Sequence, residues 1–210
     1  MTEKYLSLSG ECKTEKIIEK SKFITTSAHT AGEEQAKRFI SEVSQKYRDA
    51  THNCYAYIAD NNGNFPRFSD DGEPQGTAGM PMLEVIKNNK LYEVAVVVTR
   101  YFGGIKLGAG GLVRAYSGCV AENLASARKA SCELCVETRL FIAYPLLDSA
   151  LRYCKENGAD LINTEYLDET VLTALIKKSI YNDFIKGLTN RLNGKLRTQI
   201  SSEYIFPFEM

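Results

Sequence analysis

The sequence contains no tryptophan, two histidines and five prolines among its 210 residues. It also lacks an excess of either charge, because 26 lysines and arginines balance 26 aspartates and glutamates. A chain without net charge does not attract polyanions as a whole, so any nucleic-acid contact requires basic residues gathered on one face. Hydrophobic residues make up 44% and charged residues 25%, which excludes disordered, fibrous and coiled-coil proteins.

Long hydrophobic runs are missing as well. The purest apolar run, VAVVV at 94–98, is too short to span a bilayer. The first segment, MTEKYLSLSGECKTEK, lacks the apolar core of a signal peptide. We therefore expect a cytoplasmic protein without a membrane partner, in a compartment where thiols stay reduced.

The six cysteines are accordingly expected to be reduced thiols. Cys132 and Cys135 form a C-x-x-C pair, but a zinc site needs two further ligands. A thioredoxin-type pair opens a helix after a strand, whereas this pair follows a predicted helix. We interpret the pair as two ordinary cysteines and expect no cofactor and no metal.

The first two thirds of the chain alternate between strand and helix patterns. Thr30 followed by Glu33 is a capping-box pattern, and apolar residues then recur at helical spacing up to Tyr47. The continuously apolar YEVAVVVTR predicts a strand covered on both faces. The predicted elements are two strands in 5–30, a helix at 30–47, a strand at 52–60, a loop at 65–79, a short helix at 80–89, a strand at 92–100 and a long helix reaching about Lys129.

The last third predicts the order βαββαβ, which is the ferredoxin-like arrangement. Gly158 and Gly194 are expected to end its two helices. We predict an α+β protein of two domains, at 1–135 and 138–210. The elements of the second domain are expected at 139–145, 146–158, 160–168, 169–178, 181–194 and 196–206.

The segment RYFGGIKLGAGGLVRAY, at 100–116, holds five of the fifteen glycines. It lies between a predicted strand and a predicted helix, where backbone N–H groups and the helix dipole favour anions. Neither a Walker A motif nor a dinucleotide fingerprint is present, because Ala109 and Val113 stand at obligatory positions. Two interpretations remain open: a site for a phosphate-bearing ligand built on Arg100, Lys106 and Arg114, or glycines that only permit tight packing.

The segment SDDGEPQGTAG, at 69–79, is the second concentration of unusual residues. Asp70, Asp71 and Glu73 are able to ligate a divalent metal or to act as a general base. Asp-Gly and Glu-Pro are also simple turn chemistry, and the EF-hand spacing fails. We favour a structural or partner-binding turn over a metal site. His52 has the option of pairing with Asp70 or Asp71, although a surface role is more typical of a histidine at a strand end.

Together these segments resemble the signature of the YigZ/IMPACT (UPF0029) family. RFSDDGEPQGTAGMPML precedes VVVTRYFGGIKLGAGGLVRAYS, with the strand HNCYAY ahead of both. The final third resembles the C-terminal DUF1949 domain of the bacterial branch. The candidate binding residues on the glycine-rich side are Arg100, Gly103, Gly104, Lys106, Gly108, Gly110, Gly111 and Arg114. Those of the second segment are Asp70, Asp71, Glu73, Gly76 and Thr77.

The resemblance implies an N-terminal domain with the fold of ribosomal proteins and elongation factor G domain IV, and a ferredoxin-like C-terminal domain similar to elongation factor G domain V. It also implies a translation-associated regulator rather than an enzyme, with RNA, the ribosome or a protein as partner. Two alternatives stay open: a hydrolase-like enzyme acting on a phosphorylated or peptide-like substrate, and a protein-interaction module without anion preference. The enzyme requires that the acidic and glycine-rich segments face one cleft.

Overall fold

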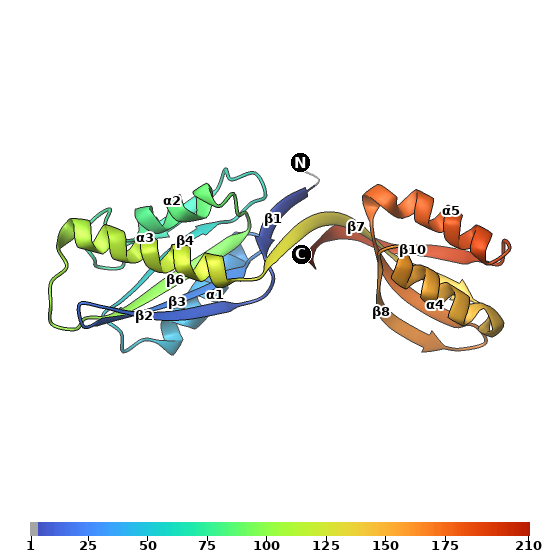
Figure 1. Ribbon diagram of the computed structural model, residues 1–210, viewed down its shortest axis with the longest axis horizontal. Coiled ribbons are helices and arrows are strands. Elements are labelled where there is room, and N and C mark those ends of the chain that lie inside the picture. Colours follow the sequence, from blue (N-terminus) through green and yellow to red (C-terminus); the bar gives the residue numbers. More distant parts are fainter. Residues whose placement is uncertain (1–3) are drawn as a thin grey trace. The chain divides into compact units, whose positions relative to one another are not determined.

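A computed structural model describes residues 4–210 (Figure 1). The chain forms two compact units: the first runs to Ser131 and includes Pro207–Met210, and the second is Cys132–Phe206. Each unit combines helices with strands, and the chain contains two antiparallel sheets of five strands. The protein is therefore an α+β protein of two domains. The interval 135–138, where we predicted the boundary, lies inside one continuous strand.

The first unit contains a sheet with the strand order β2-β3-β6-β4-β5, and all neighbouring pairs are antiparallel. Its elements are β1 (Lys4–Leu8), β2 (Cys12–Ile18), β3 (Ser21–His29), α1 (Glu33–Lys46), β4 (His52–Ile58), β5 (Pro66–Ser69), α2 (Gly79–Asn88), β6 (Val94–Tyr101) and α3 (Gly108–Ser126).

Helices cover both faces of this sheet. Val96 and Val98 of β6 belong to the core shared with α2 and α3, whereas Ala95 packs in a second cluster with Ala36 of α1. Successive side chains of a strand point to opposite faces, so the apolar run of β6 supplies both cores. The prediction of a strand covered on both faces is confirmed.

The N-terminal part of the first unit differs from the sequence-based prediction in two ways. Residues 4–29 form three strands rather than two. The capping box is wrong, because α1 begins at Glu33 after Gly32 and has no side-chain cap. The N–H of Thr30 donates to the carbonyl of Glu93 at 2.7 Å, which holds Thr30 at the sheet two residues before Gly32. Gln35 instead accepts a hydrogen bond from the Ala31 N–H at 3.0 Å.

Two smaller differences concern the predicted loop and the second long helix. The loop at 65–79 begins with a short strand, β5, which pairs with β4. The helix α3 ends at Ser126, three residues before the predicted end, and the chain turns extended at Ala127. Lys129 already opens the next strand.

The second unit has the predicted element order βαββαβ. Its strands order as β7-β9-β8, with β10 paired to the other side of β7, which also neighbours β1. Gly158 and Gly194 follow its helices with φ of 74° and 79°, as expected for helix ends. The elements are β7 (Lys129–Ile142), η1 (Tyr144–Leu146), α4 (Leu147–Glu156), β8 (Ala159–Tyr166), β9 (Thr170–Lys177), η2 (Lys178–Ile180), α5 (Tyr181–Arg191) and β10 (Arg197–Glu209).

None of the six cysteines, which all lie in the described part of the chain, forms a disulfide bond. Cys132 and Cys135 are buried within β7, and burial raises the pKa of Cys135 to about 11. Within residues 4–210 no group of three or more histidine, cysteine, aspartate or glutamate side chains is arranged to hold a metal ion. Among the helices described, none has the length and apolar character needed to cross a membrane.

Candidate functional site

The acidic segment and the glycine-rich segment meet in the first unit through Glu73 and Arg100. Nη1 of Arg100 lies 2.6 Å from Oε1 of Glu73, and the two side chains are 6% and 4% exposed. Arg100 stands near the end of β6, opposite His52 of β4, and Glu73 lies in the loop between β5 and α2. The only cation of the glycine-rich segment that belongs to a strand is therefore paired with a carboxylate that is distant in sequence.

Further side chains complete a buried network around this ion pair. The hydroxyl of Tyr116 on α3 donates to Oε1 of Glu73 at 2.8 Å, and Nη2 of Arg100 donates to Oγ of Ser21 at 3.3 Å. The thiol of Cys54 donates to the Tyr116 hydroxyl at 3.4 Å. Burial raises the pKa of Cys54 to about 12 and that of Tyr116 well above its ordinary value. Neither group is ionised at neutral pH, so neither thiol nor phenol is activated as a nucleophile.

Asp70 organises the acidic segment. Its Oδ1 accepts the N–H groups of Ala78 at 3.0 Å and Gly79 at 2.8 Å, and its Oδ2 accepts that of Gly76 at 2.8 Å. The first N–H groups of a helix have no hydrogen-bond partner within the helix. Asp70, which lies several residues before α2, accepts hydrogen bonds from N–H groups at the start of this helix. Thr77 donates to the carbonyl of Pro74 at 2.6 Å and closes the same loop. The carboxylate of Asp70 is thus occupied by the backbone.

Asp71 and His52 fix the loop to β4. Oδ2 of Asp71 accepts the N–H of Asn53 at 2.5 Å, and Nδ1 of His52 lies 2.7 Å from the carbonyl oxygen of Asp71. The pairing of His52 with an aspartate therefore uses the main chain rather than the carboxylate. Nε2 of His52 is 3.9 Å from Oε2 of Glu73, which is longer than a hydrogen bond.

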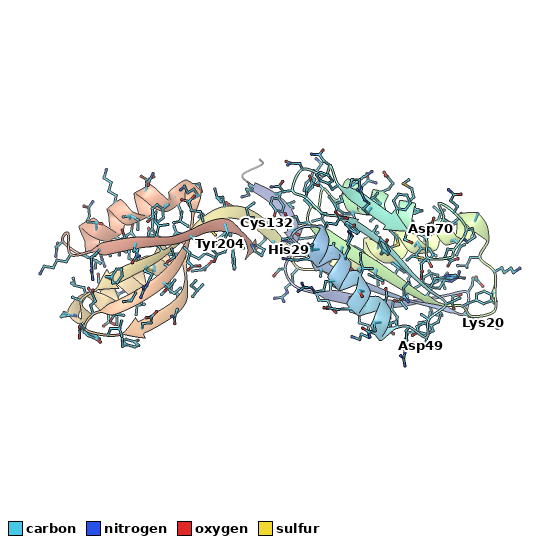
Figure 2. All side chains as sticks on the ribbon, turned by 180° about the vertical axis from the view of Figure 1, so that it is seen from behind. Lys20, His29, Asp49, Asp70, Cys132 and Tyr204 are labelled. Carbon is cyan, nitrogen blue, oxygen red and sulfur yellow. The ribbon has the colours of Figure 1, made fainter. Side chains whose placement is uncertain are left out.

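The glycines of the basic segment are required for different structural reasons, either close packing or a positive φ angle. A Cβ on Gly103 would lie 2.0 Å from the carbonyl carbon and oxygen of Lys20, so this glycine permits the segment to pack against the turn between β2 and β3. Gly104 and Gly108 have φ of 86° and 69°, with nothing within 4 Å of a Cβ built on them. Figure 2 labels Lys20 and Asp70 toward the same end of the first unit, and His29 toward the other.

The helix α3 begins directly after this segment. Gly110 and Gly111 lie in its first turn, which contains no acidic residue, and no side chain caps its N-terminus at Leu107. A Cβ on Gly111 would approach that of Leu107 to 3.0 Å. The N-terminus of α3 therefore presents backbone N–H groups and the positive end of a 19-residue helix.

A pocket of about 320 Å³ joins the two segments; we call it the shared pocket. Phe102, Lys106, Leu112 and the start of α3 line it together with the buried pair of Glu73 and Arg100. The cleft condition set out for catalysis is thus met by Glu73, whereas Asp70 and Asp71 do not line this pocket.

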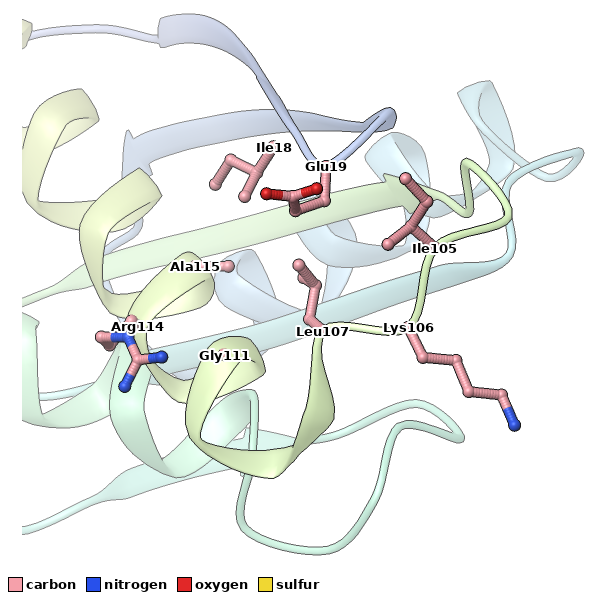
Figure 3. Close-up of a pocket in the computed structure, with 8 residues that line it drawn as sticks. All are labelled: Ile18, Glu19, Ile105, Lys106, Leu107, Gly111, Arg114 and Ala115. Atoms are coloured by element: carbon pink, nitrogen blue, oxygen red, sulfur yellow. The ribbon is translucent and has the colours of Figure 1, made fainter.

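A second pocket of about 470 Å³, the adjacent pocket, shares Lys106 and Leu107 with the first (Figure 3). Its walls include Ile18, Ile105 and Arg114. In Figure 3 Lys106 points away from the other lining side chains, so its ammonium group is accessible. Gly111 contributes backbone to the same wall.

Sequence reasoning missed the partners of the predicted residues rather than the residues themselves. Tyr116 is fully buried on α3, and the contact of its hydroxyl with Glu73 was not expected from the sequence. Phe102 is 46% exposed beside Arg100, with its ring centre 5.5 Å from the guanidinium carbon. Two glycines follow Phe102 in the sequence, whereas the exposure of its ring is visible only in the structure.

The fold and the site define a two-domain α+β protein whose two signature segments share one pocket. Residues 19–124 match the family described as "Impact N-terminal domain", and residues 140–195 match "Domain of unknown function (DUF1949)". The chain belongs to the IMPACT family and is a bacterial YigZ/YvyE-like member with both domains. The resemblance inferred from the two motifs is confirmed.

Three relatives illustrate the match. "IMPACT family member YvyE" of Bacillus subtilis (strain 168) is 36% identical over 93% of this chain and 90% of its own length. "IMPACT family member YigZ" of Escherichia coli (strain K12) is 36% identical over 86% of this chain and 89% of its own length. A solved structure titled "Crystal structure of an hypothetical protein" has a TM-score of 0.64 and 33% identity, covering 96% of this chain and 99% of its own. The similarity therefore extends over both domains.

Proposed function

We propose that this chain is a translation-associated regulatory protein that binds RNA or a ribosomal component through its glycine-rich segment. The observation that carries the proposal is the shared pocket, where Lys106 and the uncapped N-terminus of α3 stand beside exposed Phe102. A cation, a helix N-terminus and an aromatic ring are the groups that bind phosphates and stack on bases. Family membership supports the link to translational control.

The charges of the segment support contact with phosphates at two positions rather than three. Arg100 is neutralised by Glu73 and buried, so it is a poor partner for an RNA backbone. Lys106 and Arg114 form no ion pair with any described residue and line neighbouring pockets. These two cations are the ones we expect to contact phosphates.

We also propose the finer fold assignments that the resemblance implies. The first unit is assigned to the fold of ribosomal proteins and elongation factor G domain IV, and the second to the ferredoxin-like fold. The second assignment is supported by the element order and by a sheet in which β10, β7, β9 and β8 follow one another. Fold similarity to translation factors does not by itself fix function, so the site carries the functional argument.

A hydrolase-like enzyme is the second candidate, and one observation favours it: Glu73 and Arg100 line the same pocket. Acid–base chemistry there would rest on Glu73 alone, because the carboxylates of Asp70 and Asp71 are bound to backbone N–H groups. The pKa of about 12 for Cys54 argues against a thiolate nucleophile. The binding function is therefore the better supported of the two.

The test measures binding of the full-length protein to single-stranded RNA and to ribosomes as a function of salt concentration. Phosphate contacts make the affinity fall steeply with salt, and removal of one contact reduces the log–log slope by about 1. We expect Lys106→Ala and Arg114→Ala each to weaken binding and flatten this slope. Lys46→Ala, on α1, should leave both unchanged because α1 packs on the opposite face of the sheet.

If the protein binds neither RNA nor ribosomes at low salt, the proposed binding function is wrong. A single protein partner captured without dependence on nuclease treatment would instead favour an interaction module. Release of product from a phosphorylated or peptide-like substrate, lost in Glu73→Gln, would favour the enzyme.

A further inference from the structure

The size of the shared pocket limits what it can hold. Its volume of about 320 Å³ is near the lower end of small-ligand sites, which range from about 300 to 1,000 Å³. Such a pocket accommodates one small organic group rather than a continuous stretch of nucleic acid. A nucleic-acid ligand must therefore place a single nucleotide in the pocket. That nucleotide lies either at the end of the nucleic-acid chain or turns out of it.

One wall of the pocket is an aromatic ring without a core role. Phe102 is 46% exposed, and the guanidinium carbon of Arg100 lies 5.5 Å from its ring centre. Base stacking on aromatic side chains is tolerant of sequence, because every base has a π-face. Phe102 therefore provides a platform for one planar group.

The buried side chains of Arg100 and Glu73, which line the pocket, do not use all of their hydrogen-bonding capacity. Arg100 is 5% exposed, yet its Nε has no hydrogen-bond partner among the residues that the structure describes. Oε1 of Glu73 accepts two hydrogen bonds, whereas its Oε2 is 3.9 Å from the nearest histidine nitrogen, in His52. A buried unpaired donor is costly, so a ligand atom that accepts from Arg100 would recover that cost.

The mouth of the pocket is suited to a concentrated negative charge. Lys106 has no carboxylate partner in residues 4–210, and Gly108 and Ala109 contribute the start of α3. A terminal phosphomonoester carries about −1.5 to −2 charges at pH 7. An internal phosphodiester carries only one, so this site should favour a terminal phosphate.

The adjacent pocket is less suited to the same group. Glu19 lines it, and Figure 3 shows the carboxylate of Glu19 turned over the pocket toward Ile18. A carboxylate at this position repels a phosphate, whereas the carboxylate of Glu73 in the shared pocket is neutralised by Arg100. The phosphate-bearing unit is therefore assigned to the shared pocket.

We propose that the shared pocket binds one terminal nucleotide of single-stranded RNA that bears a phosphomonoester. The phosphate lies at Lys106 and the N-terminus of α3, the base stacks on Phe102, and the polar edge of the base faces Arg100 and Glu73. This inference rests on the proposed RNA-binding function and specifies which part of the RNA the site recognises.

The experiment is a competition assay on the full-length protein at low salt. A fluorescent single-stranded RNA is displaced by three unlabelled RNAs of one sequence, with a 5′-phosphate, a 3′-phosphate or only hydroxyl ends. We expect one of the phosphorylated RNAs to compete about tenfold better than the hydroxyl form, and the two phosphorylated forms identify the end that is read. The matching nucleoside monophosphate should compete as well.

The variants separate the pocket from general electrostatics. Phe102→Ala should weaken binding of the preferred RNA about tenfold, as the loss of one stacked base does. Lys106→Ala should abolish the preference for a phosphate end. Phe65→Ala, which removes a phenylalanine that is 56% exposed outside the pocket, and Lys46→Ala should keep that preference.

Two results would overturn the inference. If all three competitors act equally while RNA binding remains salt-dependent, the terminal-nucleotide assignment is wrong and the proposed function stands. If wild-type protein binds no RNA under these conditions, both are wrong. A Phe102→Ala variant that binds the phosphorylated RNA as tightly as wild type also contradicts the assignment.

Discussion

Arg100 and Glu73, 27 residues apart in the chain, form an almost fully buried ion pair with 2.6 Å between Nη1 and Oε1. The pair joins the end of β6 to the loop before α2 and so determines how the two signature segments of the family meet. It also converts an arginine that the sequence presented as a candidate for phosphate binding into a structural partner. The cations left for contact with phosphates are Lys106 and Arg114.

Glu73→Gln should lower the free energy of unfolding by about 3–5 kcal/mol, because it leaves the charge of Arg100 buried and uncompensated. Urea denaturation measures the change. Glu122→Gln is the control, since Glu122 pairs with Lys16 at the surface, where the two side chains are 49% and 47% exposed. This control should change the free energy by less than about 1 kcal/mol.

The double variant Glu73→Gln, Arg100→Met isolates the pair itself. Replacing both charged partners removes the uncompensated charge, so the double variant should be less destabilised than the sum of the two single variants. Additive effects would show that the ion pair is not the source of the destabilisation.

Gly103→Ala should destabilise the first unit by about 1–3 kcal/mol, which is the usual cost of overpacking. The new Cβ would lie 2.0 Å from the carbonyl of Lys20 and 2.5 Å from the nitrogen of Ser21, so the backbone must move. Gly118→Ala on α3 is the matched control, because nothing lies within 4 Å of its Cβ and its φ is not positive. Thermal unfolding should show a stability equal to or slightly above that of wild type for this control. A Gly103→Ala variant as stable as Gly118→Ala would contradict the tight-packing explanation.

Local sequence patterns predicted the helices and strands better than the side-chain contacts at the candidate site. The apolar run at 94–98 indicated a strand with two covered faces, and the sequence also indicated the long helix α3. No local pattern indicates that the Tyr116 hydroxyl reaches Glu73, 43 residues earlier, because that contact depends on how α3 lies over the sheet. The capping box failed for a related reason: the bond from Thr30 to Glu93 is made across the sheet and overrides the local preference.

Asp70→Ala should lower the free energy of unfolding by about 1–2 kcal/mol, because it removes acceptors for N–H groups at the start of α2. Asp70→Asn should cost less, since its amide oxygen still accepts. Glu84→Ala, on the exposed surface of α2, should change stability by less than about 0.5 kcal/mol. Chemical denaturation of the three variants measures the order. An equal loss for Asp70→Ala and Asp70→Asn would show that the negative charge, rather than the accepted hydrogen bonds, stabilises the loop.

Thiol labelling should distinguish Cys12 from the buried cysteines of the first unit. Alkylation requires the thiolate and access to solvent, and Cys12 is only partly buried. Burial raises the pKa of Cys54 to about 12 and that of Cys119 to about 11. At pH 8 we expect iodoacetamide to modify Cys12 first, with Cys54 and Cys119 modified only on unfolding, as measured by mass spectrometry of peptides. Rapid labelling of Cys54 in the native protein would contradict the closed network around Glu73.

The same pKa shift predicts how stability depends on pH in the alkaline range. The folded state keeps Cys54 protonated up to about pH 12, whereas its ordinary pKa of 9.0 applies in the unfolded chain. Below about pH 9 the thiol is protonated in both states, so its contribution to stability is constant. Between about pH 9 and pH 12 only the unfolded state loses the proton, and the free energy of unfolding should fall as the pH rises. Urea midpoints measured from pH 7 to pH 10.5 test this, and Cys54→Ala should show a shallower decline than wild type. A decline of equal slope in both proteins would assign the alkaline loss to other groups.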